Sequence, residues 1–131
     1  MLDDILRNSD FSFWSRGKHQ ITPTDFFTQW VQGEAILLDL RSPEEAEFIS
    51  LPFALHIPLH ELPDRLDEIP RDKLVATLCP GGSRAAVGYI YLRGKGFDNV
   101  RILKGALGGL LEELSPGKIR GYLLQRRHHT S

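Results

Sequence analysis

Short apolar runs alternate with helical signals along most of this chain, and this alternation constrains the fold more than any other feature. Five runs have the character of buried or edge strands: residues 20–21, 35–39, 54–57, 74–78 and 100–103. Segments with helical patterning separate them. Parallel strands need crossover connections, and helices supply such connections. The sequence therefore predicts one α/β domain with a mainly parallel five-stranded sheet and helices on both faces.

The helical segments carry their own start and stop signals. Thr22 is a good N-cap with Pro23 behind it, and apolar side chains follow at helical spacing until Gly33. Further helices are expected at residues 43–48, 59–69, 83–94 and 106–114, the second of them strained by Pro63. The side chains of the 83–94 helix that we expect to face the core are Ala86, Val87, Ile90 and Tyr91 or Leu92.

The two ends of the chain lie outside this alternation. We expect residues 1–17 to form an N-terminal arm that packs on the domain or on a second copy, or that frays. Residues 18–114 form the domain, and residues 115–131 form a basic C-terminal tail that is mainly solvated. The cations and histidines of this tail are Lys118, Arg120, Arg126, Arg127, His128 and His129.

Composition excludes several classes of function. The chain has 131 residues, of which 41% are hydrophobic and 25% charged, which is ordinary for one globular domain. A net charge of −1 points to neither nucleic acid nor a membrane as partner. The first residues include two acids and no long apolar run, which argues against a secretory signal. One cysteine permits no internal disulfide, so we expect a cytoplasmic protein.

The single cysteine carries most of the functional information. Cys79 follows the apolar run 74–78 and opens the segment Cys79-Pro80-Gly81-Gly82-Ser83-Arg84-Ala85. A lone cysteine at the end of a buried strand is usually an inert apolar residue. Here a glycine-rich loop and a helix start surround the thiol with backbone N–H groups, which favour the thiolate together with Arg84. The glycines permit close approach of a bound group, and Ser83 can cap the helix.

The segment Cys79-x-x-Gly82-x-Arg84-Ala85 resembles the active-site loop of the rhodanese (sulfurtransferase) family. Other segments resemble further motifs of that family, in the family's order and within residues 18–114. They are Leu37 to Glu45, which contains Asp-x-Arg-x-Pro-x-Glu, Ala54 to Leu59, Gly94 to Val100, and Leu103 to Ala106.

The resemblance implies a fold and a set of site residues. Cys79 would be the catalytic nucleophile, and the substrate-binding loop would consist of Pro80, Gly81, Gly82, Ser83 and Arg84. Asp39 and Arg41 would form a charged pair that supports the loop. We expect Arg84 at the pocket mouth rather than back along its helix. No cofactor and no metal are expected, since Pro58 separates His56 from His60 and no further ligand has suitable spacing.

The chain also departs from the family pattern. Residues 49–54 read Ile-Ser-Leu-Pro-Phe-Ala where the family usually has Gly-His-Ile-Pro-Gly-Ala. Pro80 stands where many active members have a basic residue, and Leu110 lies near a usual tryptophan. Proline brings neither a charge nor an N–H group to the loop. These departures predict weak use of a small anionic donor such as thiosulfate.

Three functions are compatible with these residues. The first is a sulfurtransferase that moves sulfane sulfur from thiosulfate or a persulfide through a Cys79 persulfide to cyanide or a thiol, which can belong to a protein. The acceptor must be external, since the chain has no second cysteine. The second is a phosphatase or arsenate reductase, but those loops place arginine six positions after cysteine, and Arg84 stands five after Cys79. The third is a non-catalytic rhodanese-like binding module, although inactive relatives usually lose the cysteine.

Overall fold

The computed structural model describes the backbone of residues 1–130 and the side chains of residues 1–128, so the side chain of His129 lies outside the described residues. Five parallel strands form one sheet in the order β1-β5-β4-β2-β3. The strands are β1 (Gln20–Ile21), β2 (Ala35–Asp39), β3 (Leu55–His56), β4 (Leu74–Leu78) and β5 (Val100–Leu103). The predicted α/β class with a parallel five-stranded sheet is confirmed.

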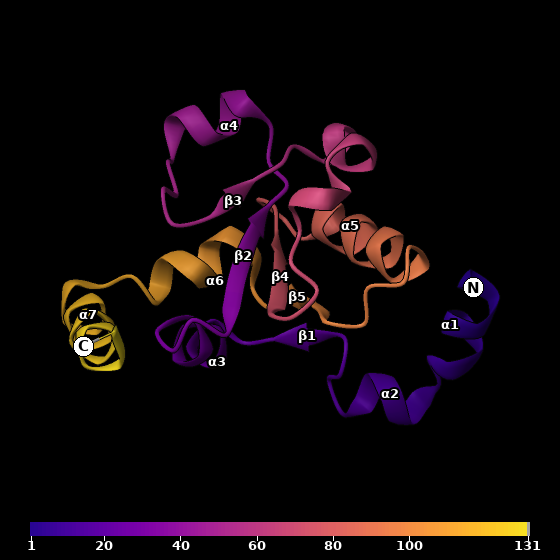
Figure 1. Cartoon of the computed structure of the whole chain (residues 1–131), viewed down its shortest axis with the longest axis horizontal. Helices are drawn as coiled ribbons and strands as arrows, with labels where there is room; N and C mark the ends of the chain where they lie inside the picture. The colour runs from indigo at the N-terminus through magenta and orange to yellow at the C-terminus, as the bar shows by residue number, and fades with distance from the viewer. Residues whose placement is uncertain (131) are drawn as a thin grey trace.

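Helices lie on both faces of this sheet (Figure 1). They are α1 (Leu2–Asn8), α2 (Phe11–Ser15), α3 (Pro23–Trp30), α4 (Pro43–Phe48), α5 (Ser83–Gly94), α6 (Ala106–Glu112) and α7 (Pro116–Thr130), with 3₁₀ turns η1 (Leu59–Asp64) and η2 (Leu66–Glu68). Successive β2 residues serve opposite faces: Leu37 joins the core beneath α3 and α6, and Leu38 joins the core beneath α5. Both leucines are fully buried, as expected for a central strand of a parallel sheet.

The sheet register brings the predicted site residues to one edge. β4 lies between β2 and β5, and Asp39 pairs with Leu78 across the β2–β4 ladder. The residues that follow these two strands, Leu40 and Cys79, therefore emerge side by side at the carboxyl end of the sheet. Ligands of open α/β sheets bind at this edge.

The segment expected as one helix at residues 59–69 forms the two 3₁₀ turns η1 and η2 instead. Pro63 lies inside η1, and its missing N–H group cannot complete an α-helical ladder. The predicted helix type was therefore wrong, although Leu62 and Ile69 of this segment are buried in the core.

The predicted core face of α5 was wrong for Ala86 and Val87, which are exposed, but Leu92 is buried and Ile90 and Tyr91 pack against the core. Ala85, Gly88, Tyr89 and Leu92 are buried, whereas Val87 is about half exposed. Residues 85–92 are almost continuously apolar, so their spacing does not select a unique face. The turn that follows Cys79 sets the direction in which the helix begins, and this turn decides which side chains face the sheet.

The N-terminal arm packs on the domain, one of the arrangements expected for it, and the C-terminal residues form a helix whose side chains are mainly exposed. In the N-terminal arm, α1 packs against α5 and buries Ile5. At the other end of the chain, Pro116 occupies the first position of α7, where proline is favoured. No helix among residues 1–130 is long and apolar enough to cross a bilayer.

Candidate active site

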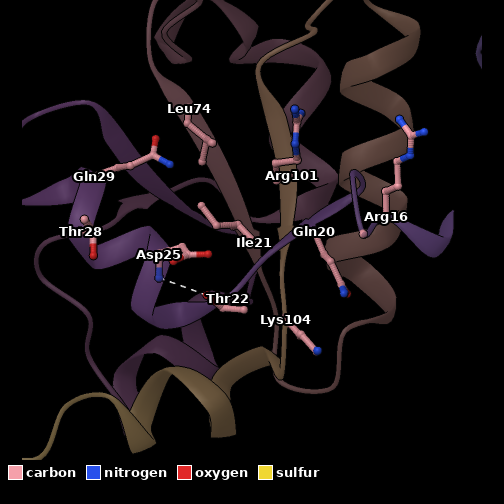
Figure 2. Close-up of a pocket in the computed structure, with 11 residues that line it drawn as sticks. Arg16, Gln20, Ile21, Thr22, Asp25, Thr28, Gln29, Leu74, Arg101 and Lys104 are labelled. Carbon is pink, nitrogen blue, oxygen red and sulfur yellow. Dashed lines mark hydrogen bonds between the residues drawn. The ribbon is translucent and has the colours of Figure 1, made fainter. Parts of the chain in front are cut away.

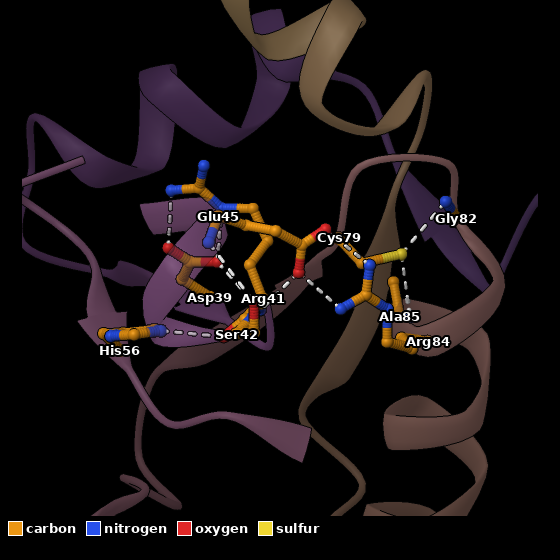
Figure 3. Close-up of polar contacts among 9 residues, drawn as sticks. All are labelled: Asp39, Arg41, Ser42, Glu45, His56, Cys79, Gly82, Arg84 and Ala85. Atoms are coloured by element: carbon orange, nitrogen blue, oxygen red, sulfur yellow. Dashed lines mark hydrogen bonds and ion pairs between the residues drawn. The ribbon is translucent and has the colours of Figure 1, made fainter. Parts of the chain in front are cut away.

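Cys79 lies directly after β4, with only 1% of its surface exposed. Its Sγ accepts two backbone hydrogen bonds, from Gly82 N at 3.0 Å and from Ala85 N at 3.2 Å (Figure 3). Gly82 has φ +99°, a left-handed conformation that an L side chain rarely adopts. This turn aims both N–H groups at the sulfur, where they stabilise negative charge.

The start of α5 differs from the predicted start. Gly82 is the N-cap residue, and Ser83 is the first helical residue rather than the cap. In an ordinary helix the N-cap side chain accepts from an N–H group in the first turn. Glycine has no such side chain, and here the Cys79 sulfur accepts from Ala85 N in its place. The sulfur therefore lies at the positive end of a twelve-residue helix.

The loop is open at its tip and anchored at its base. Gly81 and Ser83 are exposed, Pro80 is half-buried, and the sulfur lies beneath them. The carbonyl of Cys79 accepts from Leu107 N at 3.3 Å, which joins the first turn of α6 to the loop. The loop is thus fixed by the strand before it, the helix after it and a second helix beside it.

Asp39 and Arg41 form the predicted charged pair beside this loop. Arg41 Nε and Nη2 donate to the two Asp39 carboxylate oxygens at 2.9 and 2.8 Å, and Arg41 N donates to Asp39 Oδ1 at 3.1 Å. Both side chains are at most 2% exposed. The pair fixes the turn that leaves β2, as bidentate arginine–carboxylate geometry allows.

His56 takes part in this support. Its Nε2 lies 2.8 Å from the carbonyl of Arg41, an arrangement in which the ring N–H donates. Among the described residues, no group of three histidine, cysteine or acidic side chains could hold a metal ion. His56 therefore positions the backbone that carries Arg41.

Arg84 does not turn back along α5. Its guanidinium crosses to α4 beside the cysteine loop, where Nη1 and Nη2 donate to Glu45 Oε1 and Oε2 at 2.6 and 2.8 Å (Figure 3). Roughly a third of each side chain is exposed. The hydrogen bonds from Arg84 lower the pKa of Glu45 to about 2, and Glu45 in turn raises the pKa of Arg84.

Glu45 is the residue that the sequence analysis missed at this site. Its signal was present, because Ser42-x-x-Glu45 has the spacing of a capping box. In the structure Glu45 N donates to the Ser42 hydroxyl, and Glu45 Oε1 accepts from Ser42 N at 2.9 Å. The capping box holds the carboxylate in place to receive Arg84.

One close contact links α5 to the buried pair. A Cβ atom added to Gly88 would overlap Leu40 Cδ1, well inside van der Waals contact. Leu40 is fully buried and lies between Asp39 and Arg41 in the chain. Glycine at position 88 therefore allows α5 to approach the end of β2 closely.

A separate hollow of about 480 Å³ lies at the β1 edge of the sheet (Figure 2). Arg16, Arg101 and Lys104 line it together with polar side chains of α3. No residue of the 79–84 loop lines this hollow. The hollow is therefore distinct from the cysteine site.

The geometry described above matches a known family. Residues 24–113 match the family profile described as a rhodanese-like domain. The chain belongs to this family. A sulfurtransferase of Allochromatium vinosum is 35% identical over 74 residues, which cover 56% of this chain and 69% of that protein. The human single-domain sulfurtransferase TSTD1 has a similar structure, with a TM-score of 0.62 and 27% identity, and the match covers 74% of this chain and 98% of that one.

Some relatives are much longer than this chain. The tRNA sulfurtransferase of Psychromonas ingrahamii is 30% identical over 89 residues, which cover 65% of this chain and only 18% of that protein. The chain therefore spans less than a fifth of that relative. The family and its sulfurtransferase members support a sulfurtransferase-type enzyme here.

Proposed function

We propose that this protein moves sulfane sulfur from a donor to an external acceptor through a persulfide on Cys79. The observation that carries the proposal is the buried Cys79 Sγ, which accepts backbone N–H groups of Gly82 and Ala85 at 3.0 and 3.2 Å. Preorganised N–H groups of this kind favour a charged sulfur, as an oxyanion hole favours a charged oxygen. A persulfide anion has its charge on such a sulfur.

In the first half-reaction the Cys79 thiolate attacks the outer sulfur of the donor. The new S–S bond forms as the bond between that sulfur and the rest of the donor breaks, and the leaving group keeps the electron pair. Thiosulfate would leave as sulfite, and a persulfide R–S–S⁻ would leave as the thiolate R–S⁻. Cys79 then carries one additional sulfur.

In the second half-reaction an acceptor attacks the outer sulfur of the Cys79 persulfide. A thiolate acceptor becomes a persulfide, cyanide becomes thiocyanate, and the Cys79 thiolate is regenerated. The acceptor is external because Cys79 is the only cysteine of the chain. We also place the reaction in the reducing cytoplasm, which suits a free catalytic thiol.

The charges around the loop favour a persulfide donor over thiosulfate. Both nearby arginines already bind carboxylates, Arg41 that of Asp39 and Arg84 that of Glu45. Pro80 adds no charge and no N–H group. A dianion such as thiosulfate therefore meets no uncompensated cation among these residues, whereas a thiol persulfide needs less charge compensation.

The same arginine argues against phosphatase or arsenate-reductase chemistry. Such a site needs a guanidinium that faces a tetrahedral oxyanion within the loop. The terminal nitrogens of Arg84 instead donate to Glu45 on α4. Sulfur transfer needs only the cysteine and the N–H groups that surround it.

Steady-state sulfur transfer to cyanide tests the proposal, with thiosulfate and glutathione persulfide as alternative donors. We expect activity with both donors and a higher kcat/KM for glutathione persulfide. Cys79→Ser should abolish both activities, because no other thiol carries sulfur. Ser12→Ala is the matched control, since Ser12 is exposed on α2, away from the cysteine loop. Wild-type rates in Cys79→Ser would reject the mechanism.

A further inference from the structure

Apolar side chains are exposed together beside the cysteine loop. Phe48, at the end of α4, is 90% exposed, and the next residue, Ile49, is 40% exposed. Ile49 lines a groove of about 340 Å³ whose other walls are α3, α6, α7 and residues 50–53. The groove is also lined by three partly exposed apolar residues, Leu111, Ile119 and Leu123. Contiguous exposed apolar surface of this kind marks an interaction site.

The groove is built on the elements that hold the cysteine loop. α6 begins where Leu107 N donates to the Cys79 carbonyl, and Leu111 lines the groove one turn later. α4 is attached to the loop through Glu45 and Arg84, and Phe48 follows Glu45 by three residues. The groove and Phe48 therefore form one surface beside the active-site edge of the sheet.

The two sides of this surface carry opposite charges. α7 contains Lys118, Arg120, Arg126 and Arg127 and no acidic residue; Lys118 pairs with Glu113, which follows α6, and Arg126 stacks on Trp30. α4 has three glutamates within its six residues, and Glu44 and Glu47 are exposed on either side of the Arg84 partner, Glu45. The chain thus has an acidic helix that ends in an exposed aromatic side chain, beside a basic helix that borders an apolar groove.

We propose that this surface binds a second copy of the chain, in a dimer where Phe48 of each protomer inserts into the groove of the other. In a dimer with a two-fold axis, Phe48 of one protomer contacts the groove of its partner and Phe48 of the partner contacts the groove of the first. One interface therefore contains each contact twice. Each acidic α4 then faces the basic α7 of the partner. An aromatic anchor in an apolar pocket with charged residues around it is a common arrangement of interface hot spots.

The charges favour this arrangement over a contact between equivalent helices. Two α7 helices face to face would bring two sets of cations together, and two α4 helices would bring two sets of glutamates together, so both contacts repel. Reciprocal α4–α7 contact places opposite charges together at both ends of the interface. The interface also explains why Phe48 is almost fully exposed, whereas Phe26, Phe27 and Phe97 are buried in the domain core and Phe53 is partly buried.

Sedimentation equilibrium of the whole chain over a concentration series tests the first part of the proposal. We expect reversible dimers that weaken as salt is added, because charge pairs at the rim are screened. Phe48→Ala should raise the dissociation constant roughly 30-fold, the effect of removing a hot-spot aromatic side chain. Phe11→Ala is the matched control, since Phe11 is 84% exposed on α2, away from the groove. A wild-type chain that stays monomeric to about 1 mM would overturn the proposal.

Charge-reversed copies test the reciprocal pairing without assuming which side chains meet. One copy carries Arg120→Glu, Gln125→Glu and Arg127→Glu, so that three carboxylates outnumber the two remaining cations of α7 and its α4 and α7 are both acidic. The other copy carries Glu44→Lys and Glu47→Lys, so that both helices are basic. We expect each copy alone to be monomeric and the equimolar mixture to form a heterodimer.

Two outcomes of this experiment would overturn the proposed α4–α7 pairing. Homodimers of either charge-reversed copy at wild-type strength would exclude the α4–α7 pairing. Monomers in the mixture would also exclude it, provided that circular dichroism shows both copies folded. Neither outcome bears on the chemistry of Cys79, because sulfur transfer by the monomeric variants is measured separately with glutathione persulfide.

Discussion

Two arginine–carboxylate pairs flank the cysteine loop, and they differ in their exposure to solvent. Both are bidentate, with nitrogen–oxygen distances between 2.6 and 2.9 Å. Asp39 and Arg41 are at most 2% exposed, whereas Glu45 and Arg84 are 34% and 38% exposed. The same chemical contact thus occurs once inside the protein and once at its surface.

The difference in burial assigns different roles to the two pairs. A buried charge that loses its partner cannot regain hydration, so the Asp39–Arg41 pair must persist for the fold to persist. Water can replace either partner of the Glu45–Arg84 pair, so that pair contributes little stability and can open. The inner pair therefore supports the loop, and the outer pair sets how much positive charge the loop presents to a donor.

Removing the inner carboxylate should have the largest effect. Asp39→Ala leaves the Arg41 guanidinium buried without its partner, and we expect the free energy of unfolding to fall by about 3–5 kcal/mol. Urea denaturation measures this change. The matched variant at the outer pair, Glu45→Ala, should cost less than about 1 kcal/mol plus the loss of its capping-box contact. Equal losses in the two variants would contradict the distinction between the pairs.

A substitution that crowds Leu40, the residue between Asp39 and Arg41, should lower the free energy of unfolding by a smaller amount. Gly88→Ala places a Cβ against Leu40, between Asp39 and Arg41, and we expect a loss of about 1–3 kcal/mol from overpacking. Gly108→Ala on α6 is the control, because a Cβ there meets nothing within 4 Å. That control should be neutral or stabilising, as alanine is in helices. A neutral Gly88→Ala variant in thermal unfolding would mean that Leu40 shifts without cost.

Adding a cation without a carboxylate partner should change donor use. Pro80→Arg adds to the loop an arginine that has no carboxylate partner, and we expect the KM for thiosulfate to fall about fivefold with kcat nearly unchanged. The new charge binds substrate and transition state alike. Steady-state kinetics at low salt measure this effect. An unchanged or higher KM would show that the residue after Cys79 does not limit anion binding.

Releasing the cation of the outer pair should act in the same direction with a smaller magnitude. Glu45→Gln leaves the Arg84 guanidinium without its charged partner, and we expect the KM for thiosulfate to fall about twofold to threefold. The KM for glutathione persulfide should change less. Glu44→Gln, the neighbouring exposed glutamate, is the control and should leave both values unchanged. A rise in the thiosulfate KM of Glu45→Gln would indicate that the ion pair itself positions the loop.

The outer pair also predicts a small dependence of stability on pH. Arg84 holds the pKa of Glu45 at about 2, below its ordinary value of 4.5. Since the folded-state pKa is the lower one, the pair stabilises the protein above about pH 4.5 and loses this contribution as the pH falls towards 2. The stability difference between wild type and Glu45→Gln, measured in urea, should therefore shrink from pH 6 to pH 3. A difference that grows with acidification would contradict the pairing.

Much of the inner half of this site could be predicted from the sequence. The buried strands at 35–39 and 74–78 have unambiguous apolar runs, and in a parallel sheet their carboxyl ends must meet at one edge. The positions of Cys79, Asp39 and Arg41 at this edge follow from the two strands. Their roles are assigned by the family resemblance. Local sequence was sufficient because each of these residues lies within two positions of a buried strand.

The outer half depended on tertiary contacts that have no local signal. The Arg84–Glu45 pair joins residues 39 positions apart, and the face that α5 buries is set by a turn at Gly82 rather than by apolar spacing. α7 is mainly exposed, as expected of a basic tail, but its attachment through Tyr122, which stacks on Phe27 at 4.9 Å, cannot be read from residues 116–130. The residues of a segment indicate its secondary structure, whereas contacts with other segments determine where it packs.

The most direct test of the central claim is the intact mass of the protein before and after each half-reaction. After incubation with glutathione persulfide and removal of excess donor, the mass should increase by one sulfur atom, and cyanide should restore the original mass. Cys79→Ser should gain nothing under the same conditions. A wild-type protein that gains no sulfur, or that keeps it in the presence of cyanide, would contradict sulfur transfer through a Cys79 persulfide.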